Sequence, residues 1–245
     1  LYVDFVDPSA SLGDLANVTA AGGDGFYGDG SAGTVFLRFP GQDQGTLRID
    51  GGRSDGQTAP LASTLTAIGP GVAAAVGPDS LTVDGVLRPF TPNALVGLRL
   101  NPDLTQTETF EIVSNDGATL TVATPNENGV AFASRAGVGK RYAGTWIFDD
   151  VDVVRGGFLE VADRLVVEET LALSGAAVLT HPETTTSYEG VLDVMADVLG
   201  VDATSRIDVT GRGYLGGNKA GLGETAHTLG FAPGAQNGTG GSHGG

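Results

Sequence analysis

Cysteine is absent from this chain of 245 residues. Disulfide bonds, thiol nucleophiles and cysteine-ligated metals are therefore excluded together. An extracellular protein without disulfides needs another source of robustness, and a stacked β-ladder supplies one.

Long apolar segments are also missing. No run approaches the roughly 20 residues that a membrane-spanning helix needs, so we expect no membrane insertion. Leu1–Val6 alternates like a strand and lacks the charged and apolar regions of a signal peptide. With no initiator methionine either, we expect the chain to be a piece of a longer protein.

Positive charge is scarce, since Lys and Arg total 13 against 29 Asp and Glu, giving a net charge of −16. Such a surface repels phosphate backbones and anionic lipids, so nucleic acid and membranes are poor partners. It suits surroundings rich in calcium or salt, where cations screen or bridge carboxylates. Solubility alone would explain the acidity equally well.

Glycine is abundant, with 40 residues, which is more than twice the usual share of about 7%. There is no Gly-X-Y period, which excludes collagen. The hydrophobic content of 40% is too high for a disordered linker. A chain both apolar and glycine-rich indicates an all-β fold of many short strands joined by tight turns.

Four segments differ in character. Residues 1–70 alternate β-prone runs with glycine turns. Residues 71–145 contain fewer glycines and carry a hairpin signal at Asp116-Gly117, which predicts a small antiparallel β-module inserted in the chain. Residues 146–210 return to short strands, and the glycine-rich tract 211–245 is expected to pack as a loop on the rest.

Short strands follow one another closely after residue 146, with starts at Val151, Leu159, Leu165, Leu171 and Val178. This spacing is too tight for a sandwich, whose turns come every 8–12 residues or so. It predicts the sides of a right-handed parallel β-helix, a β-solenoid in which successive rungs satisfy each other's backbones. The expected core consists of stacked aliphatic residues: Val35, Leu37, Leu47, Ile49, Leu165, Val167, Leu171, Leu173, Val198, Ile207 and Val209.

The run from Arg206 to Gly217, RIDVTGRGYLGG, pairs a strand with a glycine-rich loop, and the stretch from Ala21 to Leu37 is alike in character. These segments resemble the repeat unit of very large secreted bacterial surface proteins with a pectin-lyase-like parallel β-helix. The resemblance implies a secreted or cell-surface location and a structural or adhesive role. It also implies neighbouring copies or flanking repeats as partners, and it carries over no catalytic residues.

One candidate metal site lies in a glycine-rich loop, where Asp24 and Asp29 are placed as ligands of a calcium turn would be. Calcium takes six to eight oxygen ligands, roughly, so backbone carbonyls would have to complete the shell. Calcium is the one cofactor that the sequence suggests. The alternative is that Asp and Gly serve only the tight turn.

Two further groups are candidate contacts for a glycan. Asp150 and Asp152 point to one face of a strand and could bind a sugar or a cation, or else form its solvated outside. Phe26 and Tyr27 in the glycine-rich loop could stack on a sugar ring, or else cap the edge of the fold. Extracellular polysaccharide would be the partner of such contacts.

No catalytic constellation is recognisable. His181, His227 and His243 lack zinc-ligand spacing, and there is no Gly-x-Ser-x-Gly elbow. We therefore expect no enzyme, but a stalk, filament or matrix component of a surface protein. The alternatives are a polysaccharide-active enzyme or a carbohydrate-binding module on the same scaffold.

Overall fold

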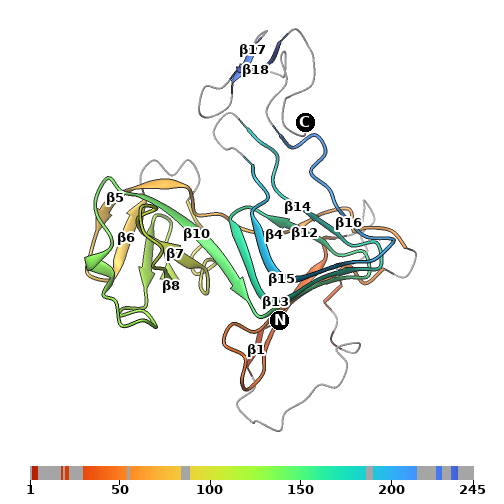
Figure 1. Ribbon diagram of the computed structural model, residues 1–245, viewed down its shortest axis with the longest axis horizontal. Helices are drawn as coiled ribbons and strands as arrows, with labels where there is room; N and C mark the ends of the chain where they lie inside the picture. The colour runs from red at the N-terminus through yellow and green to blue at the C-terminus, as the bar shows by residue number, and fades with distance from the viewer. Residues whose placement is uncertain are drawn as a thin grey trace. The chain divides into compact units, whose positions relative to one another are not determined.

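The computed structural model describes residues 2–4, 18, 20–21, 30–53, 56–83, 89–185, 190–213, 225–227 and 233–236. In these residues the chain is all-β, with a single short 3-10 helix, η2 (Phe132–Ser134) (Figure 1). The chain divides into two compact units. The first comprises Leu1–Leu65, Phe148–Ala162 and Val167–Gly245, and the second comprises Thr66–Ile147 with Asp163–Val166.

The second unit is a closed antiparallel β-barrel of six strands. Going round the barrel, the strands are β5 (Gly71–Val76), β6 (Ser80–Val83), β9 (Thr119–Val122), β8 (Phe110–Asn115), β7 (Arg99–Asn101) and β10 (Arg141–Phe148). Each neighbouring pair is antiparallel, and β10 closes the barrel because it pairs with both β5 and β7. Closure leaves this sheet without an open edge.

Local sequence explains how the barrel turns and fills. The Asp116-Gly117 hairpin is confirmed: β8 and β9 pair across it, and the Asp116 carboxylate accepts the backbone N–H groups of Ala118 and Thr119 at 2.8 and 2.7 Å. Inside, the rings of Phe110 and Phe132 meet edge to face at 5.1 Å, and both are fully buried. The barrel thus has a hydrophobic core of its own.

The expected fold class, a right-handed parallel β-helix with a small β-module inserted, is wrong. The main sheet contains a closed six-stranded antiparallel barrel, and it forms from the segment that was expected to be a small insert. The physical reason is that its alternating strands pair antiparallel and close on one another, so each strand finds a hydrogen-bonding partner on both sides within the barrel. Strand spacing alone could not reveal this choice of partners.

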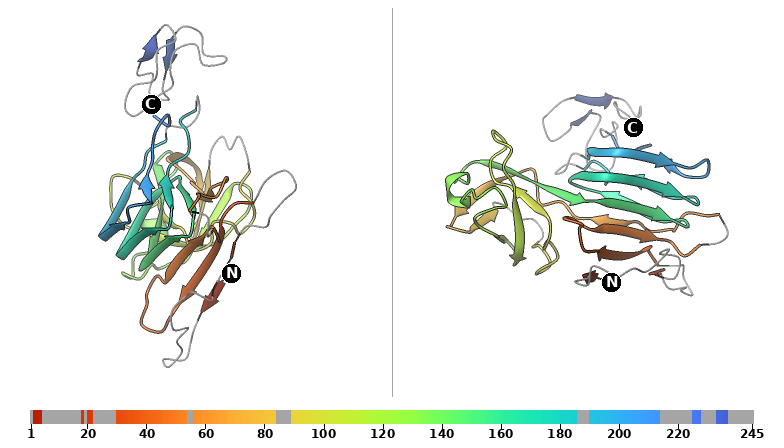
Figure 2. Two further views of the ribbon diagram at one scale, coloured as in Figure 1. Left: turned by 90° about the vertical axis from the view of Figure 1, so that its right-hand side faces the viewer. Right: turned by 60° about the horizontal axis from the view of Figure 1, so that its bottom comes forward.

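The first unit contains two groups of parallel strands (Figure 2). In one, β3 (Thr46–Asp50), β11 (Asp150–Val154) and β13 (Arg164–Ser174) are parallel neighbours, and β15 (Val194–Val201) adds to β13. In the other, the order is β4 (Ser63–Leu65), β12 (Phe158–Val161), β14 (Val178–Thr180) and β16 (Arg206–Ile207). We call each successive pair, β3–β4, β11–β12, β13–β14 and β15–β16, a layer.

Three further elements complete the strands. At the edge of the first group, β2 (Gly33–Arg38) is antiparallel to β3, and β1 (Tyr2–Asp4) is parallel to β2. Strands β17 (Thr225–His227) and β18 (Pro233–Gln236) form a separate antiparallel pair. Most of the tract 211–245 lies outside the described residues.

Aliphatic side chains repeat in register from layer to layer. Leu47, Val151 and Leu171 are successive register partners, and so are Ile49, Val153 and Leu173. Each is at most 3% exposed. The core prediction is confirmed for the following buried residues: Val35, Leu37, Leu47, Ile49, Leu165, Val167, Leu171 and Leu173.

Three core predictions are wrong, all in the last layer or just after it. Val198 is 55% exposed and Ile207 is 42% exposed. Val209 is half-buried. Ile207 is exposed because β16 is the last strand of its group, with no strand beyond it among the described residues. Val198 is exposed because it points away from the core: side chains alternate along β15, and Val201, three positions further on, is the residue aligned with the buried Leu173.

A buried carboxylate links two of the layers. Asp50, at the end of β3, is fully buried. Its carboxylate oxygens accept hydrogen bonds from Nε of Arg155, at 3.0 Å, and from Nη2 of the same residue. Its Oδ1 also accepts the backbone N–H of Gly52 at 2.9 Å. Because Arg155 follows β11, this pair joins the turns of two neighbouring strands.

Candidate functional site

One face of the second strand group gathers polar and aromatic side chains. Phe158, Val178 and Arg206 are register partners on β12, β14 and β16. Side chains alternate along a strand, so the residues two positions further on share their face. Those residues are Glu160, Thr180 and Asp208, whereas the opposite face carries the aliphatic series Leu159, Leu179 and Ile207.

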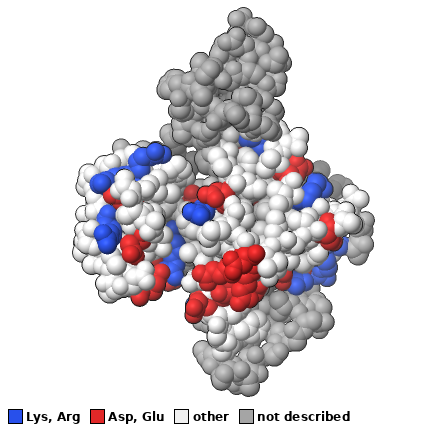
Figure 3. Space-filling model, viewed as in Figure 1, with Lys and Arg blue, Asp and Glu red and all other residues white. Residues whose placement is uncertain are grey.

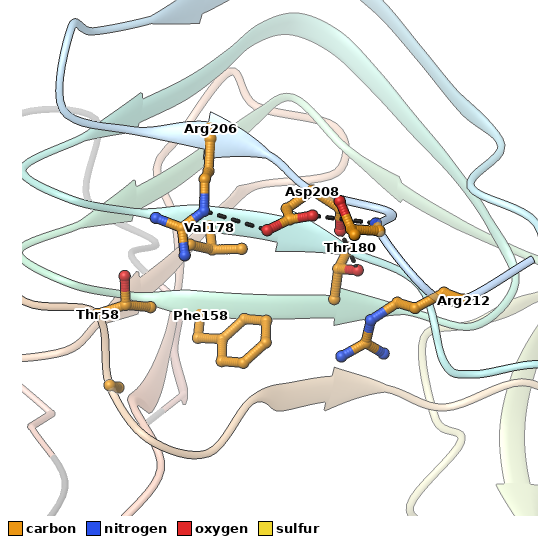
Figure 4. A pocket seen from close by; sticks show the side chains of 9 residues that line it. Thr58, Phe158, Val178, Thr180, Arg206, Asp208 and Arg212 are labelled. Atoms are coloured by element: carbon orange, nitrogen blue, oxygen red, sulfur yellow. Dashed lines mark hydrogen bonds and ion pairs between the residues drawn. The ribbon is translucent and has the colours of Figure 1, made fainter. Parts of the chain in front are cut away.

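This face is hollowed by a pocket of about 290 Å³ (Figure 4). Its lining consists of Thr58, Ala59, Phe158, Val178, Thr180, Arg206, Asp208, Thr210 and Arg212. Small-molecule pockets start at roughly 300 Å³, so the hollow has the size for a ligand of about one ring.

A loop between β3 and β4 forms one wall of the hollow. The Thr58 hydroxyl donates to the carbonyl oxygen of Ala176 at 2.8 Å, and the backbone N–H of Ala59 donates to the carbonyl oxygen of Gly156 at 2.7 Å. Both bonds cross to other layers. The wall is therefore held against the sheet and not free to fold over it.

The opposite wall is Arg212, which comes from the chain after β16. Its Nη1 donates to the carbonyl oxygen of His181 at 2.6 Å and to Oε2 of Glu160 at 2.9 Å. The carbonyl oxygen of Arg212 accepts the Thr184 hydroxyl at 3.0 Å. Two layers thus fix the position of this guanidinium, which is only 21% exposed.

Arg206 and Asp208 line the hollow as an ion pair, with Nε and Oδ2 3.3 Å apart. The pKa of Asp208 is held below its usual range, first by the backbone N–H of Thr210 at 3.0 Å and then by the Thr210 side chain and Arg206. The carboxylate is therefore ionised at neutral pH. Thr180 donates its hydroxyl to the Asp208 carbonyl oxygen at 2.6 Å, which holds the Asp208 backbone in place.

Chemically, the hollow offers an apolar floor, guanidinium donors, a carboxylate and hydroxyl oxygens acting as acceptors. Such a set suits the noncovalent binding of a polar ring. Across the described part of the chain, no group of three or more His, Asp or Glu residues is arranged to hold a metal ion.

The predicted acidic pair does not belong to this hollow. Asp150 and Asp152 lie on β11, in the other strand group, and both are half-buried. Oδ1 of Asp150 accepts the backbone N–H of Thr170 at 3.2 Å, which gives it a structural partner. Burial raises the pKa of Asp152, with Arg48 opposing the rise and Asp150 adding to it. A glycan contact there stays a prediction.

The remaining predicted site residues, Asp24, Asp29, Phe26 and Tyr27, lie outside the described residues. Calcium binding in that loop stays a prediction too. Figure 3 shows Asp and Glu side chains gathered on one face, close to where Figure 1 labels β13, whose exposed acidic residues are Glu168 and Glu169.

Sequence reasoning missed the hollow. Its strands were recognisable, since the three triplets that begin at Phe158, Val178 and Arg206 each place an aliphatic residue between two others. The site could have been located only from the register in which these three strands pair. Paired residues are 20 positions apart in sequence between β12 and β14, and 28 positions apart between β14 and β16. Unequal offsets hide this alignment from inspection of the sequence.

Comparison with known proteins gives no relative: no family model, curated protein or solved structure matches the chain. In the part of the chain that the structure describes, no helix is long and apolar enough to cross a membrane.

Proposed function

We propose that the chain is a structural and adhesive module of a large extracellular surface protein. It acts as a piece of a stalk, filament or matrix by stacking its layers against neighbouring copies or flanking repeats. The observation that carries this proposal is the last layer, β15–β16, whose inward-facing positions are apolar but uncovered.

Register shows that these positions continue the core. Ile207 is the partner of the fully buried Leu179, yet it is 42% exposed. The backbone N–H of Asp202 donates to the carbonyl oxygen of Leu173 at 3.0 Å, which aligns Val201 with Leu173. Val201 is 43% exposed, so two core series end in side chains that a further layer would bury.

The backbone supports the same proposal. Each inner strand of a group is paired on both sides, whereas β15 and β16 have no outer partner among the described residues. An unpaired strand edge is a template for adding another strand. A neighbouring layer would therefore gain both apolar burial and a hydrogen-bond ladder.

Charge regulates such stacking. With a net charge of −16, copies repel one another at low ionic strength. Salt screens that repulsion over about 10 Å at 0.1 M, and calcium could bridge carboxylates. Assembly is therefore expected to strengthen in saline or calcium-containing media, as extracellular surroundings provide.

Sedimentation velocity over a range of protein concentrations tests the proposal. The wild-type protein should form oligomers that sediment faster than the monomer. Val201→Lys should shift the distribution toward monomer because it places a charge on the stacking surface. Val138→Lys is the matched control, since Val138 is 68% exposed in the barrel unit and should leave assembly unchanged. Monomeric wild type at every concentration and salt would overturn the proposal.

Carbohydrate binding is a second candidate function, favoured by the hollow over β12, β14 and β16. A module that stacks at its end and binds a glycan on its side would be both structural and adhesive.

A further inference from the structure

We propose that the hollow over β12, β14 and β16 binds a carboxylate-bearing sugar, such as one uronic acid residue of an acidic polysaccharide. This inference goes beyond stacking, because it assigns a ligand class to a face that the layers leave open.

The floor fits the ring of a sugar. Phe158 and Val178 supply an aromatic ring and an aliphatic surface side by side on the sheet (Figure 4). Ala59 adds a second small aliphatic surface to the lining. Val178 and Ala59 are 3% and 5% exposed, so the floor is part of the packed structure. An apolar floor with a few convergent polar groups is the usual design of a small-ligand site.

The arginines fit a carboxylate. Each guanidinium carries five N–H donors in a planar fork that matches carboxylate oxygens. Nε of Arg206 donates a hydrogen bond to the Asp208 carboxylate. Nη1 of Arg212 donates to the Glu160 carboxylate and to the backbone carbonyl oxygen of His181. Among the described residues, the other nitrogens of both arginines make no hydrogen bond, so their N–H donors can serve a ligand at the hollow.

Local charge selects a monoanion. The positive charges of Arg206 and Arg212 are balanced by Asp208 and Glu160, so the hollow is close to neutral within an acidic chain. A single carboxylate can share the guanidinium donors with the resident acids. A phosphate, with greater negative charge, would meet both those acids and the net charge of −16.

Acceptors around the floor fit sugar hydroxyls. Thr58 is half-buried and has committed its hydroxyl hydrogen to the carbonyl oxygen of Ala176, so its oxygen can accept from a ligand. Thr180 is 1% exposed, and its hydroxyl holds the Asp208 backbone in place. The ionised Asp208 accepts as well. A ligand with a carboxylate and several hydroxyls satisfies these groups, whereas an apolar ligand would leave them desolvated and unpaired.

The test is titration of the full chain, followed by NMR, with three probes: galacturonate, glucose as a neutral sugar of the same ring size, and acetate. Only galacturonate should bind at low millimolar concentration or below. Arg206→Gln should weaken its binding roughly tenfold, the loss typical of a charge-assisted hydrogen bond. Arg206 is 55% exposed, so the substitution leaves the core intact.

Arg141→Gln, at an exposed position on the barrel, is the control and should bind as wild type does. Phe158→Leu keeps an apolar floor and removes the ring, so it should weaken binding severalfold with an unchanged circular dichroism spectrum. The proposal is overturned if the neutral sugar or acetate binds as well as galacturonate, or if Arg206→Gln binds galacturonate as tightly as wild type. Val201→Lys should retain sugar binding, which separates this inference from the stacking proposal.

Discussion

A buried carboxylate in the barrel unit makes its stability depend on pH. Asp163 is 8% exposed, and its Oδ2 accepts the backbone N–H of Ile68 at 2.8 Å. Burial raises the pKa of Asp163 to about 7, although the backbone N–H groups of Ile68, Gly69 and Gly144 act to lower it. Two opposing effects therefore meet on one side chain, and burial is the larger.

The sign and size of the effect follow from linkage. The unfolded chain releases the Asp163 proton near 3.8, while the folded unit holds it until about pH 7. Between these values the unfolded state binds fewer protons, so the free energy of unfolding falls as pH rises. Three pKa units at about 1.4 kcal/mol each give an upper limit of about 4 kcal/mol lost between pH 4 and 7.

Asp163→Asn isolates this contribution. Urea unfolding of wild type and variant should be followed from pH 3 to 8 by the fluorescence of Trp146, the single tryptophan, which lies in the same unit. The lowered pKa values of Asp103 and Asp116 give the opposite trend, but they cancel in the difference between the two proteins.

The difference in unfolding free energy should move in favour of Asp163→Asn as pH rises, by up to about 4 kcal/mol. A flat difference would refute the reasoning. A difference moving toward wild type would mean that the N–H donors outweigh burial.

Two stability predictions concern the layers of the first unit, and chemical denaturation checks both. Leu171→Ala should cost about 2–5 kcal/mol because Leu171 is fully buried between layers, and Leu171→Asp should prevent folding, whereas Val198→Asp should cost little at its exposed site. Arg155→Leu should cost about 1–3 kcal/mol because Asp50 loses two charge-assisted hydrogen bonds, while Arg48, whose Nε lies 3.8 Å from Asp50 Oδ2, remains as a neighbouring cation. When Arg155→Leu is made in the Asp50→Asn variant, the loss of unfolding free energy should be much smaller. An equal loss in the wild-type and Asp50→Asn backgrounds would contradict the pairing of Asp50 with Arg155.

Local features of this fold were predictable from the sequence because short-range chemistry determines them. Glycine content and alternation indicated an all-β chain, and the Asp116-Gly117 turn gave the β8–β9 hairpin. Alternating aliphatics such as Leu171 and Leu173 correctly marked the buried face.

Long-range pairing was not predictable, and it decides both the barrel and the hollow. Closure of the barrel depends on β10 meeting β5 and β7, whose residues lie tens of positions earlier. The hollow depends on Phe158 and Arg206 sharing a face through unequal offsets. Ile207 was wrongly predicted to be buried. It alternates with polar residues as a core residue does, but it is exposed because it lies in the last layer.

The most direct test of the stacking claim is electron microscopy of the chain at high protein concentration, in calcium and in chelator, beside Val201→Lys. The account predicts linear assemblies of wild type that extend from the β15–β16 end and are lost or shortened in the variant. Discrete single particles of wild type under every condition would contradict it.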